Sequence, residues 1–214
     1  MSEYCTVAGH ARAEYEEKRS VFIADAFRVT SEEEAVSQIR AVREEFPDAR
    51  HTVYAYLLRD GQKTRYSDDR EPQGTAGLPV LEVLRKNGCT DALITVTRYF
   101  GGVLLGTGGL CRAYTSAAVS ALQKAGIATA VPYSFYRFFC GYGEYDKFLS
   151  LLRAHGATPG ETGFTDRVEV SYSIPASEEA SLSALLCEAS AGKLTPVFVR
   201  REEILVVKNN LREK

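Results

Sequence analysis

The stretch ITVTRYFGGVLLGTGGLCRAYTSAAVSALQKAG, at positions 94–126, constrains the fold more than any other part of the chain. Residues 92–98 alternate between apolar and polar side chains, which predicts a half-buried strand. A glycine-rich loop follows, and then apolar residues from Leu110 to Ala125 recur with helical spacing. Gly126 stands where a helix often takes a left-handed terminating residue. The stretch therefore predicts a strand, a loop and a helix in succession.

The glycines of this loop need a physical reason, because each costs conformational entropy on folding. They are Gly101, Gly102, Gly106, Gly108 and Gly109. One interpretation is an anion site, since the next helix offers free N–H groups and a partial positive charge at its start. Arg98 at the strand end and Arg112 in the first helical turn would then add charged donors. The other is close packing of an alanine-faced helix on a sheet. Neither G-x-G-x-x-G nor G-x-x-x-x-G-K-[ST] matches the loop, so both interpretations stay open.

A polar loop at residues 63–77 gathers three carboxylates, Asp68, Asp69 and Glu71. Clustered carboxylates suit a magnesium ion or a water molecule held for hydrolysis. In the alternative, these acids pair with Arg65 and Arg70 in a solvated loop. Because magnesium sites usually need a phosphate group as well, no metal and no cofactor are expected from the sequence.

Composition excludes a strongly basic polyanion-binding protein, since 26 lysines and arginines face 28 acidic residues. Neither half of the chain has a basic excess, so nucleic-acid binding would depend on a local patch. No long apolar run or signal-peptide core is found, and no membrane partner is expected. The five cysteines are scattered without a C-x-x-C pair, which favours free thiols and a cytoplasmic protein.

The periodicity on either side of Pro132 predicts an α+β protein with two domains, residues 1–131 and 132–214. The first domain should contain strands at 4–15, 21–29 and 51–58, a turn at 59–62, and helices at 31–46, 80–86 and 110–125. Ser31 with Glu34 forms a capping box at the start of the first helix. The second domain reads as strand, helix, strand, strand, helix, strand, the ferredoxin-like β-α-β-β-α-β arrangement.

Two long motifs, SDDREPQGTAGLPVL and TRYFGGVLLGTGGLCRAY, resemble the YigZ/Impact family of cytosolic proteins. KRSVFIA near residue 20 and PDARHTVYAY near residue 50 resemble flanking motifs of the same family. The resemblance covers residues 15 to about 125, and the segment after 132 is similar to the ferredoxin-like domain of bacterial members. It implies an N-terminal Impact domain with the fold of domain IV of elongation factor G, shared with some small-molecule kinases. The C-terminal domain would then be similar to domain V of that factor.

The resemblance marks motif positions and one departure from the family pattern. The family usually has glycine between the second aspartate and the glutamate, where this chain has Arg70. Eukaryotic members regulate translation through an additional N-terminal domain, so their partner is not expected here. The residues at family-motif positions are Lys18, Ser20, His51, Asp68, Asp69, Glu71, Gly74, Thr75, Gly77, Arg98, Tyr99, Gly101, Gly102, Gly106, Gly108 and Gly109.

Three functional hypotheses follow. The first is a nucleic-acid or ribosome-associated factor linked to translation, in which the glycine-loop amides, Arg98 and Arg112 meet RNA phosphates. Lys18, Arg19 and Arg65 would extend that patch, and Tyr66, Tyr99 and Phe100 would stack on unpaired bases. The second is a magnesium-dependent enzyme acting on a phosphorylated small molecule, with Asp68, Asp69 or Glu71 as metal ligand or base. The third is a protein-interaction module that uses an open sheet face of the second domain.

Overall fold

The computed structural model of the chain describes residues 2–59 and 63–207. These residues form two compact units. The N-terminal unit comprises residues 4–129 and 205–207, and the C-terminal unit residues 2–3 and 130–204. The division falls within strand β7(Ile127–Cys140), so Pro132 lies inside a strand and not in a linker. The turn expected at 59–62 lies largely outside the described residues.

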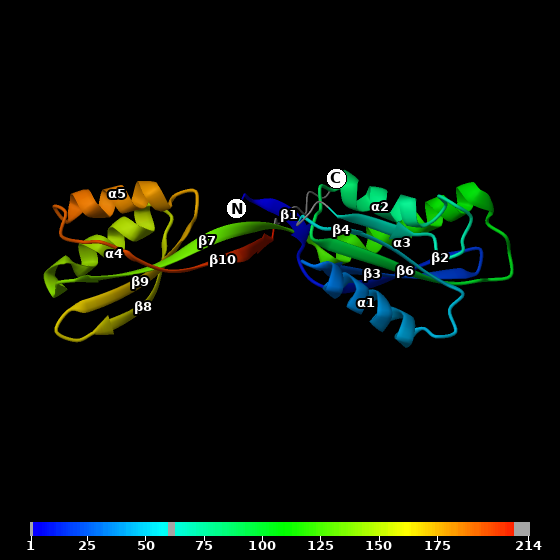
Figure 1. Ribbon diagram of the computed structural model, residues 1–214, viewed down its shortest axis with the longest axis horizontal. Helices are drawn as coiled ribbons and strands as arrows, with labels where there is room; N and C mark the ends of the chain where they lie inside the picture. The colour runs from blue at the N-terminus through cyan, green and yellow to red at the C-terminus, as the bar shows by residue number, and fades with distance from the viewer. Residues whose placement is uncertain (1, 60–62, 208–214) are drawn as a thin grey trace. The chain divides into compact units, whose positions relative to one another are not determined.

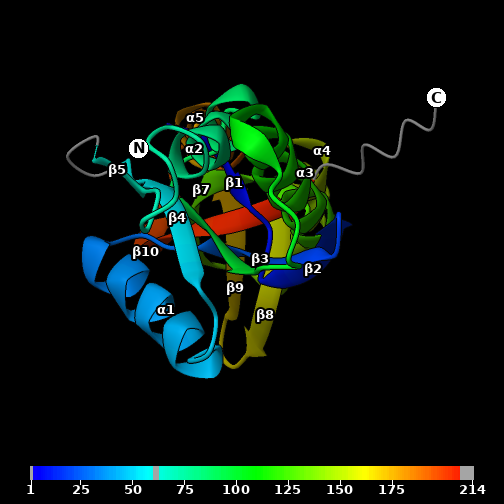
Figure 2. The same ribbon diagram turned by 90° about the vertical axis from the view of Figure 1, so that its right-hand side faces the viewer.

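An antiparallel sheet in the order β2-β3-β6-β4-β5 is the centre of the N-terminal unit. Helices α2 and α3 cover one face of this sheet and α1 covers the other (Figures 1 and 2). The elements are β2(Ala11–Glu17), β3(Ser20–Arg28), α1(Glu32–Glu45), β4(His51–Leu57), β5(Thr64–Ser67), α2(Gly77–Lys86), β6(Ala92–Tyr99) and α3(Gly106–Ala125).

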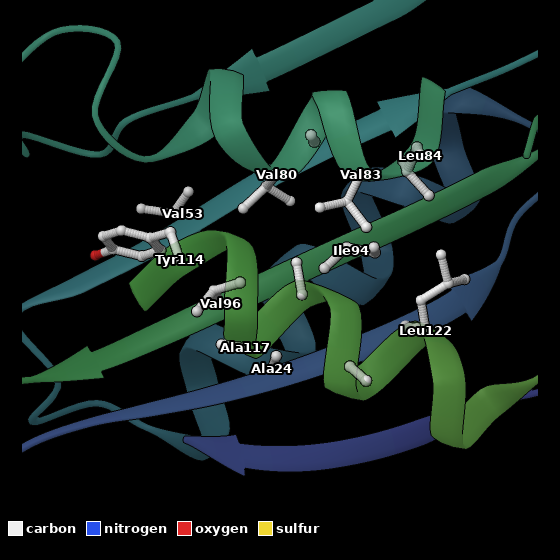
Figure 3. Close-up of a cluster of buried hydrophobic side chains, with 14 of the residues drawn as sticks. Ala24, Val53, Val80, Val83, Leu84, Ile94, Val96, Tyr114, Ala117 and Leu122 are labelled. Atoms are coloured by element: carbon white, nitrogen blue, oxygen red, sulfur yellow. The ribbon is translucent and has the colours of Figure 1, made fainter. Parts of the chain in front are cut away.

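The main core of this unit lies between the sheet and the α2–α3 pair. Alternate residues of the central strands, such as Ile94 and Val96 on β6, point toward the helices (Figure 3). From α3, the small side chain of Ala117 allows close approach to the sheet, and Tyr114 lies at one end of the cluster (Figure 3). The hydroxyl of Tyr114 points away from the alkyl side chains, toward polar partners described below.

Strand β6 is buried on both faces, so the prediction of a half-buried strand is wrong. Thr95 and Thr97 are fully buried on the face that α1 covers, which also carries Leu93. The alternation of apolar and polar side chains in this strand therefore distinguishes two covered faces. One carries aliphatic side chains, and the other carries threonines together with Leu93.

Three predicted boundaries are also corrected. Helix α3 begins at Gly106, so Gly106, Gly108 and Gly109 belong to its first turn and not to a loop. Helix α2 begins at Gly77, ahead of Pro79. Strand β5 occupies part of the predicted polar loop, because a short, exposed edge strand has no apolar alternation to reveal it. The capping prediction is confirmed, since the Ser31 hydroxyl accepts a hydrogen bond from the Glu34 amide.

The C-terminal unit has the predicted β-α-β-β-α-β order, and the two-domain α+β architecture is confirmed. Strands β7, β9 and β8 follow one another in its sheet, and β10 pairs with β7. The same sheet includes β1, whose residues belong to the N-terminal unit. Helices α4 and α5 lie together on one face (Figure 1). Of the helices in the described residues, none is both long and apolar enough to cross a membrane. The remaining elements of the chain are β1(Tyr4–Val7), β7(Ile127–Cys140), the 3-10 turn η2(Tyr142–Glu144), α4(Tyr145–Ala154), β8(Thr158–Phe164), β9(Val168–Pro175), α5(Glu179–Ala189) and β10(Val197–Val207).

Candidate functional site

The ends of three neighbouring strands bring Ser20, His51 and Arg98 together. Arg98 of β6 pairs in register with Phe22 of β3 and with His51 of β4. Because side chains alternate along a strand, Ser20, His51 and Arg98 all point to the face covered by α2 and α3. At this end of the sheet the aliphatic core gives way to polar side chains.

A buried carboxylate, Glu71, accepts hydrogen bonds from two of its neighbours. Arg98 Nη1 donates to Glu71 Oε1 at 2.6 Å, and the Tyr114 hydroxyl donates to the same oxygen at 2.8 Å. The side chains of Arg98 and Glu71 are only 7% and 4% exposed, so the ion pair is shielded from water. A second nitrogen of Arg98, Nη2, lies 3.5 Å from the Ser20 hydroxyl. We call Ser20, His51, Glu71, Arg98 and Tyr114 the Glu71 cluster.

His51 completes the cluster and has a defined orientation. Its Nδ1 lies 2.7 Å from the carbonyl oxygen of Asp69, which can only accept, so Nδ1 carries the proton. Nε2 therefore faces Glu71 Oε1, at 3.8 Å. The imidazole thus presents its second nitrogen toward the carboxylate.

A cavity of about 470 Å³ opens beside this cluster. Its polar lining combines Arg98, His51 and Glu71 with two exposed cations, Arg50 and Arg70. We call it the Arg98 cavity. The remaining lining residues are Pro72, Phe100, Leu104, Leu105, Gly106, Thr107 and Leu110.

The start of helix α3 forms one wall of the Arg98 cavity. The N-cap residue Leu105 has no side chain that could accept from the first-turn amides, and the first turn contains no acidic residue. Gly106 and Thr107 are exposed and line the cavity. The first amides of a helix have no intrahelical partner and carry partial positive charge. This wall can therefore donate hydrogen bonds to an anion.

One polar atom of Arg98, a residue that lines the cavity, is buried without a partner. Within the described part of the chain, Nε of Arg98 makes no hydrogen bond although it is shielded from water. A buried N–H group without an acceptor is unfavourable and requires an explanation. Because Arg98 and the first residues of α3 line the same cavity, an anion bound there would lie near both.

Several other basic and aromatic residues predicted for the site lie elsewhere. Arg112 lines a separate cavity of about 720 Å³ together with Lys86 and Gly109. Arg65 faces α1, where its Nε lies 3.9 Å from Glu32, and Lys18 occupies the β2–β3 turn with φ 48°. Tyr99 points to the face opposite Arg98 and donates to Asp48 at 2.9 Å. Of the predicted set, Arg98, Glu71, Phe100 and Gly106 line the same cavity.

The predicted acidic site does not form, because its three carboxylates point to different partners. Asp68 accepts hydrogen bonds from the amides of Gly74, Ala76 and Gly77 and so holds the start of α2. Asp69 accepts from the Thr52 amide at 2.7 Å. Nowhere in residues 2–59 or 63–207 do three His, Cys, Asp or Glu side chains form a group that could hold a metal.

Backbone conformation explains both this divergence and the departure at Arg70. Asp69 and Arg70 both adopt left-handed dihedrals, with φ values of 41° and 69°. A glycine takes this conformation without strain, which is a physical reason for the glycine that the family resemblance leads us to expect at position 70. Here the turn directs Arg70 toward the cavity, where its Nη2 donates to the carbonyl oxygen of Arg50 at 3.3 Å.

Sequence reasoning missed the site roles of Arg50, Arg70 and Tyr114. Arg50 and Arg70 are isolated arginines in loops and carry no pattern of their own. Helical spacing correctly predicts that Tyr114 faces the core, but it does not reveal that the Tyr114 hydroxyl donates a hydrogen bond to Glu71. A tyrosine within an alanine-rich buried stripe is the signal that could have indicated a polar partner.

Tyr114 should make the stability of the chain depend on alkaline pH. Burial, and then the charge of Glu71, raises the pKa of Tyr114 well above its usual range. In the unfolded chain this tyrosine ionises near pH 10. Its contribution to stability is therefore complete below about pH 10 and is lost as pH rises further. We expect Tyr114→Phe to lose about 1 kcal/mol at neutral pH and to weaken the fall in unfolding free energy between pH 9 and 11.

Chemical denaturation across that pH range measures both effects. Tyr66→Phe is the control, because Tyr66 is an exposed tyrosine of the edge strand, and it should change neither quantity. An unaltered pH dependence in Tyr114→Phe would contradict the prediction.

Comparison with known proteins reveals relatives along most of the chain. Residues 18–122 match the Impact N-terminal domain, and residues 138–193 match a domain of unknown function, DUF1949. The chain is 35% identical over 180 residues to the IMPACT family member YigZ of Escherichia coli K12, covering 83% of this chain and 88% of that protein. It is 31% identical over 194 residues to the IMPACT family member YvyE of Bacillus subtilis 168, covering 90% and 89%. A crystal structure of a hypothetical protein shares 32% sequence identity and a TM-score of 0.60, covering 94% of this chain and 98% of that one.

Proposed function

This chain belongs to the Impact family. We propose that it binds RNA through phosphate groups held in the Arg98 cavity. It would act in the cytoplasm as an RNA- or ribosome-associated factor linked to translation. All five cysteines carry free thiols, which suits a reducing compartment.

The single observation that carries the proposal is the unpartnered Nε of Arg98 beside the uncapped start of α3. Arginine donors and helix N-terminal amides together form the usual protein environment of a phosphate group. Arg50 and Arg70 add two cations at the rim, and no carboxylate within the described residues pairs with either. These groups would form the local patch that a chain of balanced charge needs for nucleic-acid binding.

An aromatic surface adjoins this patch. Phe100 is 41% exposed and lines the cavity. The guanidinium carbons of Arg50 and Arg98 lie 5.9 and 5.6 Å from its ring centre. A base of single-stranded RNA could stack against Phe100 while its phosphate meets the arginines, the combination that sequence-tolerant RNA binders use.

The second prediction tests phosphate binding. We expect Arg50→Ala and Arg70→Ala each to weaken binding of a fluorescent single-stranded RNA, because each removes one rim cation. Each substitution should also lower the slope of log affinity against log salt by about 0.7. Both residues are exposed, so folding should be preserved. Fluorescence anisotropy at several salt concentrations measures affinity and slope together.

Two arginines on other faces of the same unit provide matched controls. Arg112→Ala and Arg65→Ala remove the same charge away from the Arg98 cavity and should leave affinity nearly unchanged. If all four variants weaken binding equally, attraction is diffuse and the cavity has no special role. Binding that ignores salt would exclude phosphate contacts altogether.

One observation favours a second candidate, an enzyme acting on a phosphorylated small molecule. His51 lines the cavity, and the Asp69 carbonyl oxygen holds its Nδ1, which leaves Nε2 as the nitrogen that could take up a proton, as a general base must. Thermal shift measurements with inorganic phosphate and mononucleotides distinguish this candidate. Stabilisation by mononucleotides without any RNA binding would favour the enzyme.

A further inference from the structure

We propose that the Arg98 cavity recognises a terminal phosphomonoester, the phosphate at the end of a nucleotide chain, and not an internal phosphodiester. The inference rests on the proposed function, because it names the kind of phosphate that the same site would bind. Charge, depth and size of the cavity all support it.

The charge of the lining matches a doubly charged phosphate. Three guanidinium groups, those of Arg50, Arg70 and Arg98, face one carboxylate, Glu71, which is already paired with Arg98. The cavity therefore has an excess of two positive charges, in addition to the partial charge of the α3 N-terminus. A phosphomonoester carries about −1.5 to −2 at neutral pH, whereas each internal phosphodiester carries a single negative charge.

A second cavity in the described part of this unit does not have this excess. That second cavity has the larger volume, about 720 Å³, and also contains two cations, Arg112 and Lys86. It contains two carboxylates as well, Glu17 and Glu82, so its lining has no net charge. The positive excess therefore coincides with the buried arginine and the free helix N-terminus.

The burial of Arg98 favours a chain end. Its side chain is 7% exposed, whereas Arg50, Phe100 and Leu104, which line the same cavity, are exposed. An internal phosphate is flanked by a nucleotide on each side and needs a groove that is open at both ends. A terminal phosphate can enter such a cavity first, with only one nucleotide following it.

The size of the cavity agrees with this arrangement. About 470 Å³ lies in the lower part of the range of roughly 300–1,000 Å³ found for small-ligand pockets. This space suits a phosphate and one nucleoside better than a longer stretch of RNA. In that position the terminal base lies next to Phe100 at the rim, where it can stack.

Competition binding with matched oligonucleotides tests the inference on the full chain. One short single-stranded RNA sequence is prepared with a 5′-phosphate, with a 3′-phosphate and with hydroxyl groups at both ends, and a nucleoside monophosphate is added as a fourth competitor. We expect one phosphorylated end to bind at least about tenfold more tightly than the unphosphorylated RNA. The 5′ and 3′ forms identify the end, and tight binding of the monophosphate would identify a free nucleotide as the source of the phosphomonoester.

Variants show whether the preference belongs to the cavity. Arg70→Ala should abolish most of the preference for the phosphorylated end, while Arg112→Ala should retain it. Equal, salt-dependent affinity for phosphorylated and unphosphorylated RNA would overturn the inference and leave phosphate binding intact. No binding of any RNA or of the monophosphate would overturn both the inference and the proposed function.

Discussion

Replacing Gly101 with alanine is expected to lower the free energy of unfolding by about 3 kcal/mol or more. A Cβ atom at this position would lie 2.1 Å from the carbonyl carbon of Arg19, 2.3 Å from its oxygen and 2.4 Å from the Ser20 nitrogen. All three are backbone atoms of the tight β2–β3 turn, so they cannot move aside as a flexible side chain would. The added methyl group must therefore separate two strands of the central sheet.

The same substitution should also disturb the site. The Gly101 amide donates to the Ser20 hydroxyl at 3.1 Å, and that hydroxyl is also a neighbour of Arg98. Displacing residue 101 would therefore move a member of the Glu71 cluster. Urea denaturation gives the stability change, and RNA affinity under native conditions gives the effect on binding.

Gly108→Ala is the matched control for this prediction. Gly108 lies in the first turn of α3, has no left-handed φ, and its added Cβ would meet only Arg112 Nη1 at 3.7 Å. Since alanine favours helix over glycine by up to about 1 kcal/mol, stability should stay equal or rise. Gly106, two residues earlier, differs in this respect, because it has a left-handed φ of 71°. Equal melting temperatures of the Gly101→Ala variant and the natural chain would contradict the close approach of residue 101 to the Arg19–Ser20 backbone.

Arg98→Met is expected to destabilise the chain by about 3–5 kcal/mol. The substitution keeps an extended apolar side chain but leaves the carboxylate of Glu71 buried without its cation. An uncompensated buried charge costs far more than a surface ion pair contributes. The lost unfolding free energy is therefore mainly the cost of a buried, unpaired Glu71 carboxylate. It is not the net contribution of the Arg98–Glu71 ion pair to stability.

A second substitution, at Glu71, separates the cost of the unpaired carboxylate from the contribution of the ion pair. Glu71→Gln removes the charge but keeps an oxygen that can accept from the Tyr114 hydroxyl. We expect the double variant, Arg98→Met with Glu71→Gln, to regain at least half of the lost stability. Its RNA binding should remain absent, because the buried guanidinium is gone. Additive losses in the double variant would show that the two side chains do not depend on each other.

Much of the architecture followed from local patterns. The capping box at Ser31 and the apolar spacing of α3 report directly on backbone conformation, because one helical face must be buried. The β-α-β-β-α-β order of the C-terminal unit could be predicted for the same reason. Errors were concentrated at boundaries where local signals are weak, as at the exposed edge strand β5 and the glycine start of α3.

The candidate site was predictable only in part, since membership in it depends on which side of the sheet a side chain faces. Arg98 and Tyr99 are adjacent in sequence, yet one points into the Glu71 cluster and the other bonds to Asp48 on the opposite face. Asp68 and Glu71 are close in sequence, yet Asp68 holds the start of α2 while Glu71 pairs with Arg98. Neither contact can be inferred from spacing along the chain, because both are made across strands and loops.

Periodicity and short motifs were enough to establish the strand–glycine–helix centre, the order of elements in the C-terminal unit and the likeness to the Impact family. Only the tertiary structure decided that Arg50, Arg70 and Arg98 share one cavity while Arg112 and Arg65 lie elsewhere. The physical reason is that sheet register and left-handed turns fix side-chain directions, and an anion site depends on directions more than on composition.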